Sequence, residues 1–420
     1  MSLSLKEIKL IGDEIPWLKD FRNQGQSAFL SRGIPTAKTE EWKFTKPNRF
    51  LEHDFTPVSQ GQNVRAKKTE LPFDCYKICF ENGVFDPCNS DLPQGVEVIP
   101  LIEAVMFQTK TRDKVGSITD ISKHPFAALN SAYLNEGVYI RIDTNVDIIK
   151  PIVLVYHVSA SDNSELYNLR NVVEVAKKSS VNIVEYYYYD GDIKSSYLTN
   201  VVNEMFVSEN AKLKHYKIQD EAYKAGHLSL TSVSVDAGGH YKSFCLQKGA
   251  DLSRNETKVF LTAENASTEV DAAYIMNGWA TLDTTTDIEH LKPHTYSSQL
   301  VKGVVGGQAK GVFQGKIHIA PDAVKTEGYQ LHKAMLLTND AEIDIKPELE
   351  IFADDVKCSH GSACGQLDAE QLFYMRSRGI KEDDAKQLLI EAYLNDVIAK
   401  VDDENICNWI KSLLDNNLSD

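Results

Sequence analysis

From about residue 71 to residue 365 this chain is a succession of short β-rich runs with little convincing helix between them. Runs such as 138–142, 152–156 and 181–186 are rich in Val, Ile, Leu and Tyr. Others alternate apolar and polar residues, as in residues 341–346, which is typical of strands with one buried face. A segment of this length has to bury its strands either in a stacked solenoid or in a β-sandwich.

A small turn recurs before several of these runs. It contains Asp, Asn, Glu, Gly or Ala, and its markers are Ala211, Gly239, Ala266, Ala323 and Ala341, separated by 28, 27, 57 and 18 residues. The steps are irregular but fall in the range of solenoid coils, which bury one face of every strand in a shared interior. The recurrence favours a solenoid, and the pattern alone leaves a β-sandwich as the alternative.

The two ends of the chain differ in texture from the middle. Residues 1–70 look helical and irregular, and Pro16 suits the first turn of a helix. In residues 366–420, Asp368 begins a capping-box variant, and two apolar helical stripes follow from about Glu382. We therefore predict three domains, at 1–70, 71–365 and 366–420. The C-terminal stripes must pack on the β-region, on each other or on a partner.

Composition excludes several classes of protein. The chain has 420 residues and a formal charge of −15, which disfavours binding to nucleic acid or to an anionic membrane. No apolar run approaches the roughly 18 residues that cross a bilayer, and the N-terminus lacks a signal-peptide layout. Seven cysteines in this length do not form a secreted disulfide framework, and Cys75, Cys79 and Cys88 lack zinc-ribbon spacing. We expect a cytoplasmic protein with free thiols.

A glycine-rich segment at residues 306–316 is not a phosphate-binding loop. Gly311 and Gly315-Lys316 enclose three residues rather than four, and Ile317 stands where Ser or Thr would bind magnesium. Tight turns between strands explain these glycines. We therefore predict that the chain does not hydrolyse ATP by itself.

The strongest chemical cluster is Cys358-Ser359-His360 with Cys364 nearby. A thiol and an imidazole two residues apart on a strand project to the same face, and both bind iron or zinc. Three ligands do not close a site, so a partner or a distant residue would complete it. A structural role and a nucleophile–base pair stay open, and the neighbouring Asp354 and Asp355 allow acid–base chemistry or a solvated strand end.

Several segments together resemble one known family. They are Pro-His-Thr-Tyr-Ser-Ser-Gln at 293–299, Gly-Val-Phe-Gln-Gly-Lys-Ile at 311–317, the long run at 346–361, Gly-Gln-Leu-Asp at 365–368 and the run at 372–380. Gly-Ile-Pro-Thr at 33–36 and Glu-Trp-Lys-Phe-Thr at 41–45 add to the match. The chain resembles the SufB/SufD family of the SUF iron–sulfur cluster assembly system. Its length and the Lys-Cys-Ser-His form of the motif resemble the SufD branch more than the SufB branch.

The resemblance implies a right-handed parallel β-helix flanked by N-terminal and C-terminal helical regions. It also implies a complex with SufB and two copies of the ATPase SufC. The sequence leaves open whether the chain forms a homodimer when SufB is absent. The C-terminal helices would dock SufC through an apolar set: Leu388, Leu389, Ala392, Tyr393, Trp409 and Ile410.

By the same resemblance, Cys358 and His360 match the functional motif and contribute to an iron or transient iron–sulfur cluster site shared with the partner chain. The isolated chain need not hold iron or a cluster. The sequence has Ser362-Ala363-Cys364 where the family commonly has Ala-Thr-Val, so Cys364 is an extra thiol and a secondary candidate.

Three functions follow as hypotheses. The leading one is a non-enzymatic scaffold subunit that helps to place iron or sulfur in a shared site. The second is a SufB-like scaffold that accepts persulfide and acts alone, which would need several thiols converging on one site. The third is a carbohydrate-active β-helix enzyme that uses Asp354 and Asp355.

Overall fold

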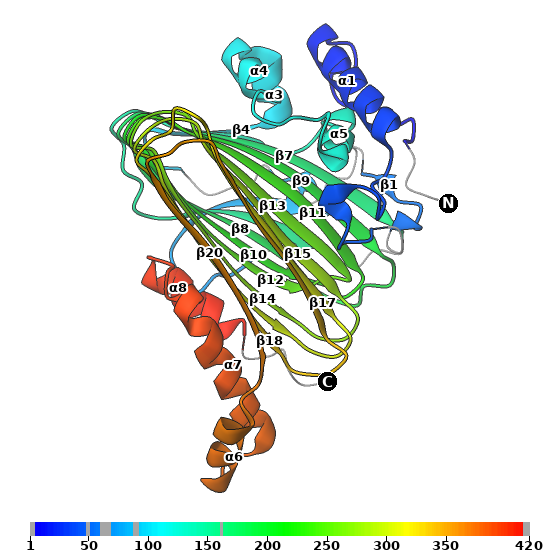
Figure 1. Cartoon of the computed structure of the whole chain (residues 1–420). Helices are drawn as coiled ribbons and strands as arrows, with labels where there is room; N and C mark the ends of the chain where they lie inside the picture. The colour runs from blue at the N-terminus through cyan, green and yellow to red at the C-terminus, as the bar shows by residue number, and fades with distance from the viewer. Residues whose placement is uncertain (1–4, 48–50, 59–68, 87–91, 160–162, 415–420) are drawn as a thin grey trace.

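The computed structural model describes residues 5–47, 51–58, 69–86, 92–159 and 163–414. In these residues the chain forms two long sheets that face each other along one stack (Figure 1). The first sheet contains β1 Thr56–Pro57, β4 Val96–Pro100, β5 Val138–Ile142, β7 Glu165–Val175, β9 Tyr197–Val207, β11 Ala225–Val235, β13 Leu252–Leu261, β15 Thr281–His290, β17 Lys310–Ile319 and β19 Glu342–Ile351. The second contains β2 Tyr76–Glu81, β3 Val84–Phe85, β6 Ile152–Val158, β8 Ser180–Tyr189, β10 Lys212–Glu221, β12 His240–Gly249, β14 Ser267–Met276, β16 Tyr296–Val305, β18 Thr326–Leu336 and β20 Val356–Gln366.

From β5 onward the chain alternates between the two sheets, so each pair of consecutive strands makes one coil. Strands of successive coils pair in parallel and in register: His240 lies beside Ser267, which lies beside Tyr296 and then Glu327. These steps of 27, 29 and 31 residues are the length of one coil. The predicted parallel β-helix is therefore confirmed, and the β-sandwich alternative is wrong.

The recurring turns have a backbone explanation. Asn210, Gly238 and Asn265 each adopt a left-handed conformation, with φ of 56°, 62° and 61°, two residues before a strand of the second sheet. Gly and Asn adopt this conformation at the lowest cost, which explains the turn composition. The irregular steps also have a cause. The step of 57 residues spans two coils, and Ala341 precedes β19 of the other sheet.

The middle of the solenoid interior is polar, which the sequence pattern did not indicate. Glu185 and His215 are buried neighbours whose Oε1 and Nε2 atoms lie 2.6 Å apart, and His215 Nδ1 lies 2.9 Å from the Tyr241 hydroxyl. Burial by itself would raise the pKa of Glu185, but His215 and Lys217 outweigh it and hold the pKa at about 2. The stack is thus held by hydrogen-bonded charge as well as by apolar contacts.

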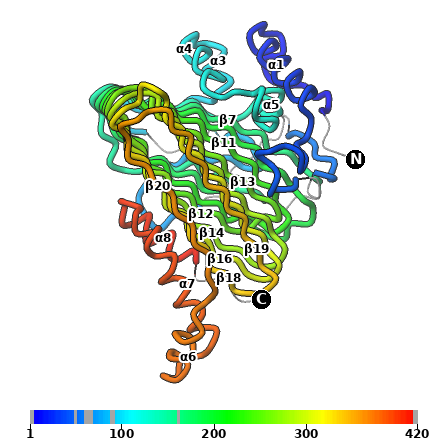
Figure 2. Tube along the Cα trace, viewed as in Figure 1, coloured from blue at the N-terminus to red at the C-terminus, as the bar shows by residue number. Residues whose placement is uncertain are grey.

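Helices cover the outer faces of both sheets (Figure 2). On the first sheet, apolar side chains of the strands pack against α1 Pro16–Arg32 and α5 Pro125–Ala132, and nearby lie α3 Leu101–Phe107 and α4 Thr109–Lys114. On the second sheet lie α7 Glu382–Ile398 and α8 Glu404–Ser412. The helices between residues 101 and 132 interrupt a region whose sequence suggested strands, and the division into three domains stays a prediction.

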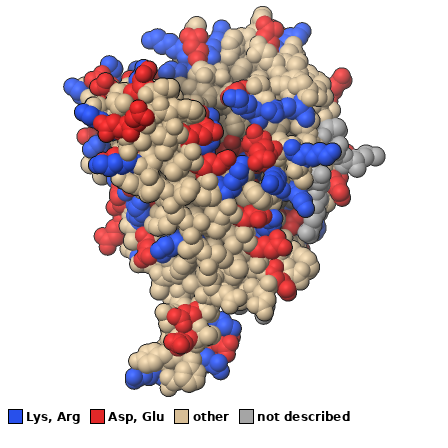
Figure 3. Space-filling view, viewed as in Figure 1, with Lys and Arg blue, Asp and Glu red and all other residues tan. Residues whose placement is uncertain are grey.

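The helix α6 Ala369–Ser377 stands apart from the solenoid. It projects from the main body and carries both acidic and basic side chains (Figure 3). Its Phe373 and Tyr374 side chains are exposed. As the sequence predicts, Asp368 caps this helix by accepting hydrogen bonds from the backbone N–H groups of Glu370 and Gln371. None of the helices in the described residues combines the length and apolar character needed to cross a bilayer.

Candidate functional site

The last coil leaves one end of the solenoid open. The strands β19 and β20 stand at the ends of their sheets, and each pairs with the preceding coil along one edge. Most of their residues are half-buried or exposed, whereas alternate residues of the preceding strand β18 are buried. The backbone N–H and C=O groups on the outer edges of β19 and β20 therefore form a template on which another strand can pair.

Register places the predicted site residues on the interior side of β20. Cys358, His360 and Cys364 pair with Gly328, Gln330 and Ala334 of β18, which are all buried in the solenoid. Side chains at matching positions of parallel strands share a face, so the three candidates face the interior at the open end. This orientation was not contained in the sequence motif.

Cys358 is half-buried in an apolar corner of the last coil, where Ile317, Leu349 and Val356 surround it. Its Sγ lies close to Gly328, where an added Cβ would come within 3.5 Å. Burial raises the pKa of the Cys358 thiol, so the side chain is a protonated thiol until a metal or a cation draws it into the thiolate form.

His360 and Cys364 are both exposed at the open end. His360 follows Cys358 by two residues, roughly 7 Å along the strand, and Cys364 lies roughly 20 Å from Cys358. Within the described residues, no three His, Cys, Asp or Glu side chains gather closely enough to hold a metal ion. Asp354 and Asp355 lie in the exposed turn between β19 and β20, and Cys88 lies outside the described residues.

The predicted SufC-docking residues divide into two groups. Trp409 is 6% exposed and Ile410 is fully buried, because α8 packs both against the outer face of the second sheet. They attach the helices to the solenoid and are not available on the surface, which corrects their assignment to a docking surface. Leu388, at 47% exposure, and Ala392 are exposed, while Leu389 and Tyr393 are half-buried.

A groove of about 550 Å³ runs between α7 and α8. Leu388, Ala392 and Asn395 line it from α7, and Asn408 and Lys411 line it from α8. We call this feature the α7/α8 groove. Its lining combines exposed apolar residues of α7 with polar residues of both helices, a mixture found on protein-binding surfaces.

An N-terminal segment crosses the first sheet and ties its last coils together. We call residues 40–45 the N-terminal strap; it includes the short helix η1 Glu40–Trp42. The backbone carbonyl of Glu41 accepts hydrogen bonds from Arg254 Nη1 at 2.8 Å and from Gln314 Nε2 at 3.1 Å. The Glu40 carboxylate pairs with Lys346 Nζ at 2.8 Å. The strap thus joins β13, β17 and β19, the last strand of its sheet.

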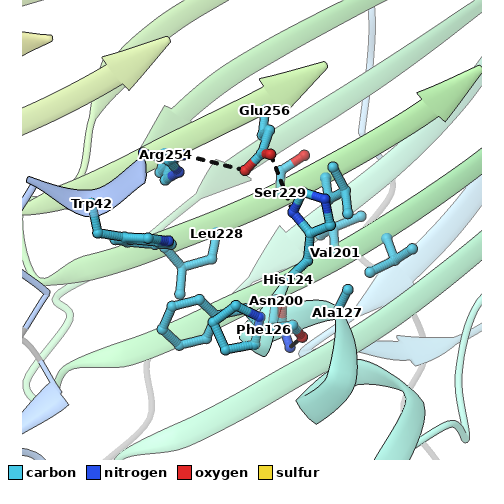
Figure 4. Close-up of a pocket in the computed structure, with 13 residues that line it drawn as sticks. Trp42, His124, Phe126, Ala127, Asn200, Val201, Leu228, Ser229, Arg254 and Glu256 are labelled. Atoms are coloured by element: carbon cyan, nitrogen blue, oxygen red, sulfur yellow. Dashed lines mark hydrogen bonds and ion pairs between the residues drawn. The ribbon is translucent and has the colours of Figure 1, made fainter. Parts of the chain in front are cut away.

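Beneath the strap lies a small pocket (Figure 4). The Trp42 ring covers it from one side, 4.4 Å from the Arg254 guanidinium and 5.2 Å from the Phe126 ring. Glu256 pairs with Arg254 and with His124 at 3.2 Å. Burial would raise the pKa of Glu256, but His124 and Arg254 outweigh it and hold the pKa at about 2. In the sequence, the 41–45 motif adds to the family resemblance but does not predict this pocket.

Comparison with known protein families covers most of the chain. Residues 157–393 match the SufBD core domain of the SUF system for iron–sulfur cluster assembly, and residues 6–154 match the SufBD protein N-terminal region. The core match includes the open end with Cys358 and His360, as well as β18 and most of α7.

Individual relatives agree with these matches. The iron–sulfur cluster assembly protein SufD of Escherichia coli is 28% identical over 90% of this chain and 88% of its own length. The SufD protein of Bacillus subtilis is 26% identical over 98% of this chain and 96% of its own length. An iron–sulfur cluster assembly SufBD family protein of Synechocystis sp. is 29% identical over 95% of this chain and 91% of its own length. The resemblance found in the sequence motifs is confirmed: the chain belongs to the SufBD family of the SUF iron–sulfur cluster assembly system.

Proposed function

We propose that this protein is a cytoplasmic, non-catalytic scaffold subunit that pairs with SufB and the ATPase SufC and supplies residues to a cluster-building site at the SufB interface. One observation carries the proposal: Cys358 and His360 lie on the interior side of β20, at the end where β19 and β20 are the last strands of their sheets among the described residues. Neither nucleic acid nor a membrane is among the partners that we propose.

The open end suits a partner that is itself a β-solenoid. A second solenoid can extend both sheets by strand pairing, which brings the interior-facing groups of the two chains together at the junction. SufB would occupy this place in the assembly, and a second copy of this chain would occupy it when SufB is absent. The shared interior would then surround Cys358 and His360 with residues of both chains.

The chemistry of the two side chains fits ferrous iron and sulfide as cargo. Imidazole is a good ligand for iron, and thiolate binds iron in iron–sulfur clusters. Two donors from one chain leave coordination positions for the partner and for sulfide. The roughly 20 Å between Cys358 and Cys364 gives no support to a scaffold that assembles clusters alone, because one cluster cannot reach both thiols.

Replacing His360 with alanine tests the site. We expect the complex of this chain with SufB and SufC to form normally, and its iron and sulfide content after anaerobic reconstitution to fall severalfold. The physical reason is the loss of one nitrogen ligand from an exposed position, where a truncation changes folding stability by about 0.5 kcal/mol or less. Iron and acid-labile sulfide are measured per complex.

His318→Ala is the matched control. His318 is a partly exposed histidine on β17 of the other sheet, hydrogen-bonded to Glu350 of β19 at 3.1 Å. It belongs to the alternate set of β17 residues that faces away from the interior. This control complex should load iron like the wild type. Equal loading by the His360→Ala complex would remove the ligand role.

We further propose that the α7/α8 groove is the SufC-docking surface. Leu388→Asp places a charge at an exposed apolar position that lines the groove, where desolvation of the carboxylate opposes docking. We expect the variant to keep the thermal unfolding midpoint of the wild type. Its affinity for SufC should fall at least tenfold, as measured by pull-down or by calorimetric titration.

Leu30→Asp serves as its control, because Leu30 is 65% exposed on helix α1, on the opposite side of the solenoid (Figure 1). The same chemical change there should leave SufC binding intact. Normal SufC binding by Leu388→Asp would place the contact elsewhere, with the projecting helix α6 as the next surface to test.

A further inference from the structure

Three polar side chains form one row along the solenoid interior and lead from the sealed core to the open end. Gln299 on β16 lies in register with Gln330 on β18, which lies in register with His360 on β20. Neighbouring strands are about 4.8 Å apart, so side chains at these positions are stacked directly on one another. Gln330 is therefore the interior neighbour of the proposed iron ligand.

The Gln330 amide is buried and unsatisfied. Its side chain belongs to a residue that is 3% exposed, and among the described residues neither its Oε1 nor its Nε2 has a hydrogen-bond partner. Buried polar groups almost always have such a partner, so an amide with both atoms unpaired calls for an explanation. The absence of a side chain at Gly315 of β17 leaves space for the Gln330 amide, because a Cβ there would lie 1.8 Å from Gln330 Nε2.

The neighbouring buried histidine differs in this respect. His332, two residues further along β18, already has its Nε2 within 2.8 Å of the Tyr274 hydroxyl, and its ring stacks on Phe313 at 4.8 Å. These contacts fix its ring inside the core. Within the part of the chain that the structure describes, the Gln330 amide makes no such hydrogen bond, and its register neighbour towards the open end is His360.

We propose that Gln330 is the positioning residue for His360. When a partner chain covers the open end, Gln330 Oε1 accepts a hydrogen bond from one imidazole nitrogen of His360 and directs the other nitrogen towards ferrous iron. A metal-bound imidazole almost always donates its second N–H to a carbonyl or carboxylate oxygen in this way, which fixes its tautomer and ring orientation. The inference rests on the proposed function, since it assumes that His360 is a ligand.

The test is a double-mutant cycle on the complete complex with SufB and SufC, titrated anaerobically with ferrous iron. Gln330→Met keeps the side-chain shape and removes the acceptor, and we expect ferrous affinity to fall about 10- to 100-fold, the usual loss for a residue that orients a ligand. Gln330→Glu keeps an acceptor oxygen in place and should retain most of the affinity. In a His360→Ala background, Gln330→Met should change the affinity less than twofold, because the group it orients is gone.

Gln299→Met is the control one coil deeper in the same row, where the amide oxygen already accepts a hydrogen bond from Thr286 Oγ1 at 2.6 Å. It should leave ferrous affinity unchanged. The isolated Gln330→Met chain should have a higher thermal unfolding midpoint than the wild type, because an unsatisfied buried amide has been removed. This metal-free measurement separates a positioning role from a structural one.

Each remaining result contradicts the inference in a recognisable way. A lower unfolding midpoint for Gln330→Met would make the amide structural. Unchanged ferrous affinity for Gln330→Met, or an equal loss in the His360→Ala background, would show that Gln330 does not act through His360. Wild-type affinity in the single His360→Ala complex is a different result, because it overturns the proposed function itself.

Discussion

Replacing Arg170 with methionine is expected to lower the free energy of unfolding by about 3–5 kcal/mol, the usual cost of removing one partner of a buried ion pair. Arg170 on β7 and Glu204 on β9 are both fully buried, and Nη2 and Oε2 lie 2.7 Å apart. The guanidinium also donates to Ser131 Oγ at 3.0 Å in α5. The substitution leaves the Glu204 carboxylate without its counter-charge between the first sheet and the helices on it.

Denaturant unfolding measures this loss of stability. Two further variants test whether it comes from the unpaired buried charge. Arg170→Met with Glu204→Leu should recover most of the lost stability, because no charge then stays buried. Arg141→Met removes an exposed ion pair with Asp143 and should cost about 0–1 kcal/mol. Similar losses from Arg170→Met and Arg141→Met would show that Arg170 does not hold the helices on the sheet.

Trp42→Ala is expected to destabilise the protein by about 3–5 kcal/mol and to loosen the last coils of the first sheet. The Trp42 ring is 6% exposed and covers the Arg254 guanidinium. Arg254 in turn pairs with Asp283 Oδ2 at 2.6 Å on β15, and Thr45 of the strap donates to the same carboxylate. Loss of the ring admits water to these buried charges and detaches the strap from β15, β17 and β19.

Hydrogen–deuterium exchange localises this effect. Amides of β15, β17 and β19 should exchange faster in Trp42→Ala, whereas those of β5 and β7 at the other end of the sheet should change little. Trp279→Ala is the matched control, because Trp279 is 64% exposed in the turn before β15. An equal increase in the exchange rate of amides along the whole sheet in Trp42→Ala would mean that the strap does not act specifically on the last coils.

Much of the fold is encoded locally and could be predicted. The alternation of apolar and polar residues marks strands, and the Asn and Gly turns mark the left-handed corners of the coils. The start of α1 at Pro16 and the Asp368 cap of α6 are also decided by neighbouring residues. Helix α3 was missed because it follows β4 directly in a largely apolar segment, and short apolar runs look the same for a strand and a buried helix.

The candidate site could be predicted only in part. Cys358 and His360 stand two residues apart on a strand, so the sequence alone determined that they share a face. Whether that face is the inside or the outside of the solenoid depends on the pairing of β20 with β18, about 30 residues earlier in the chain. The same holds for Gln330, because its proposed role depends on its register with His360.

The sequence by itself determined the strand periodicity, the turns and the family motif, because each depends on backbone preferences and side chains within a few residues, whereas the choice of a solenoid over a β-sandwich rests on pairing between strands about 30 residues apart. Only the tertiary structure decided which groups are buried and which are free. Trp409 and Ile410 face the sheet while Leu388 of the same helical pair faces solvent, although all three look alike as members of apolar stripes. Burial is a property of contacts between distant segments, as when the strap residue Glu41 meets Arg254, and no local pattern contains it.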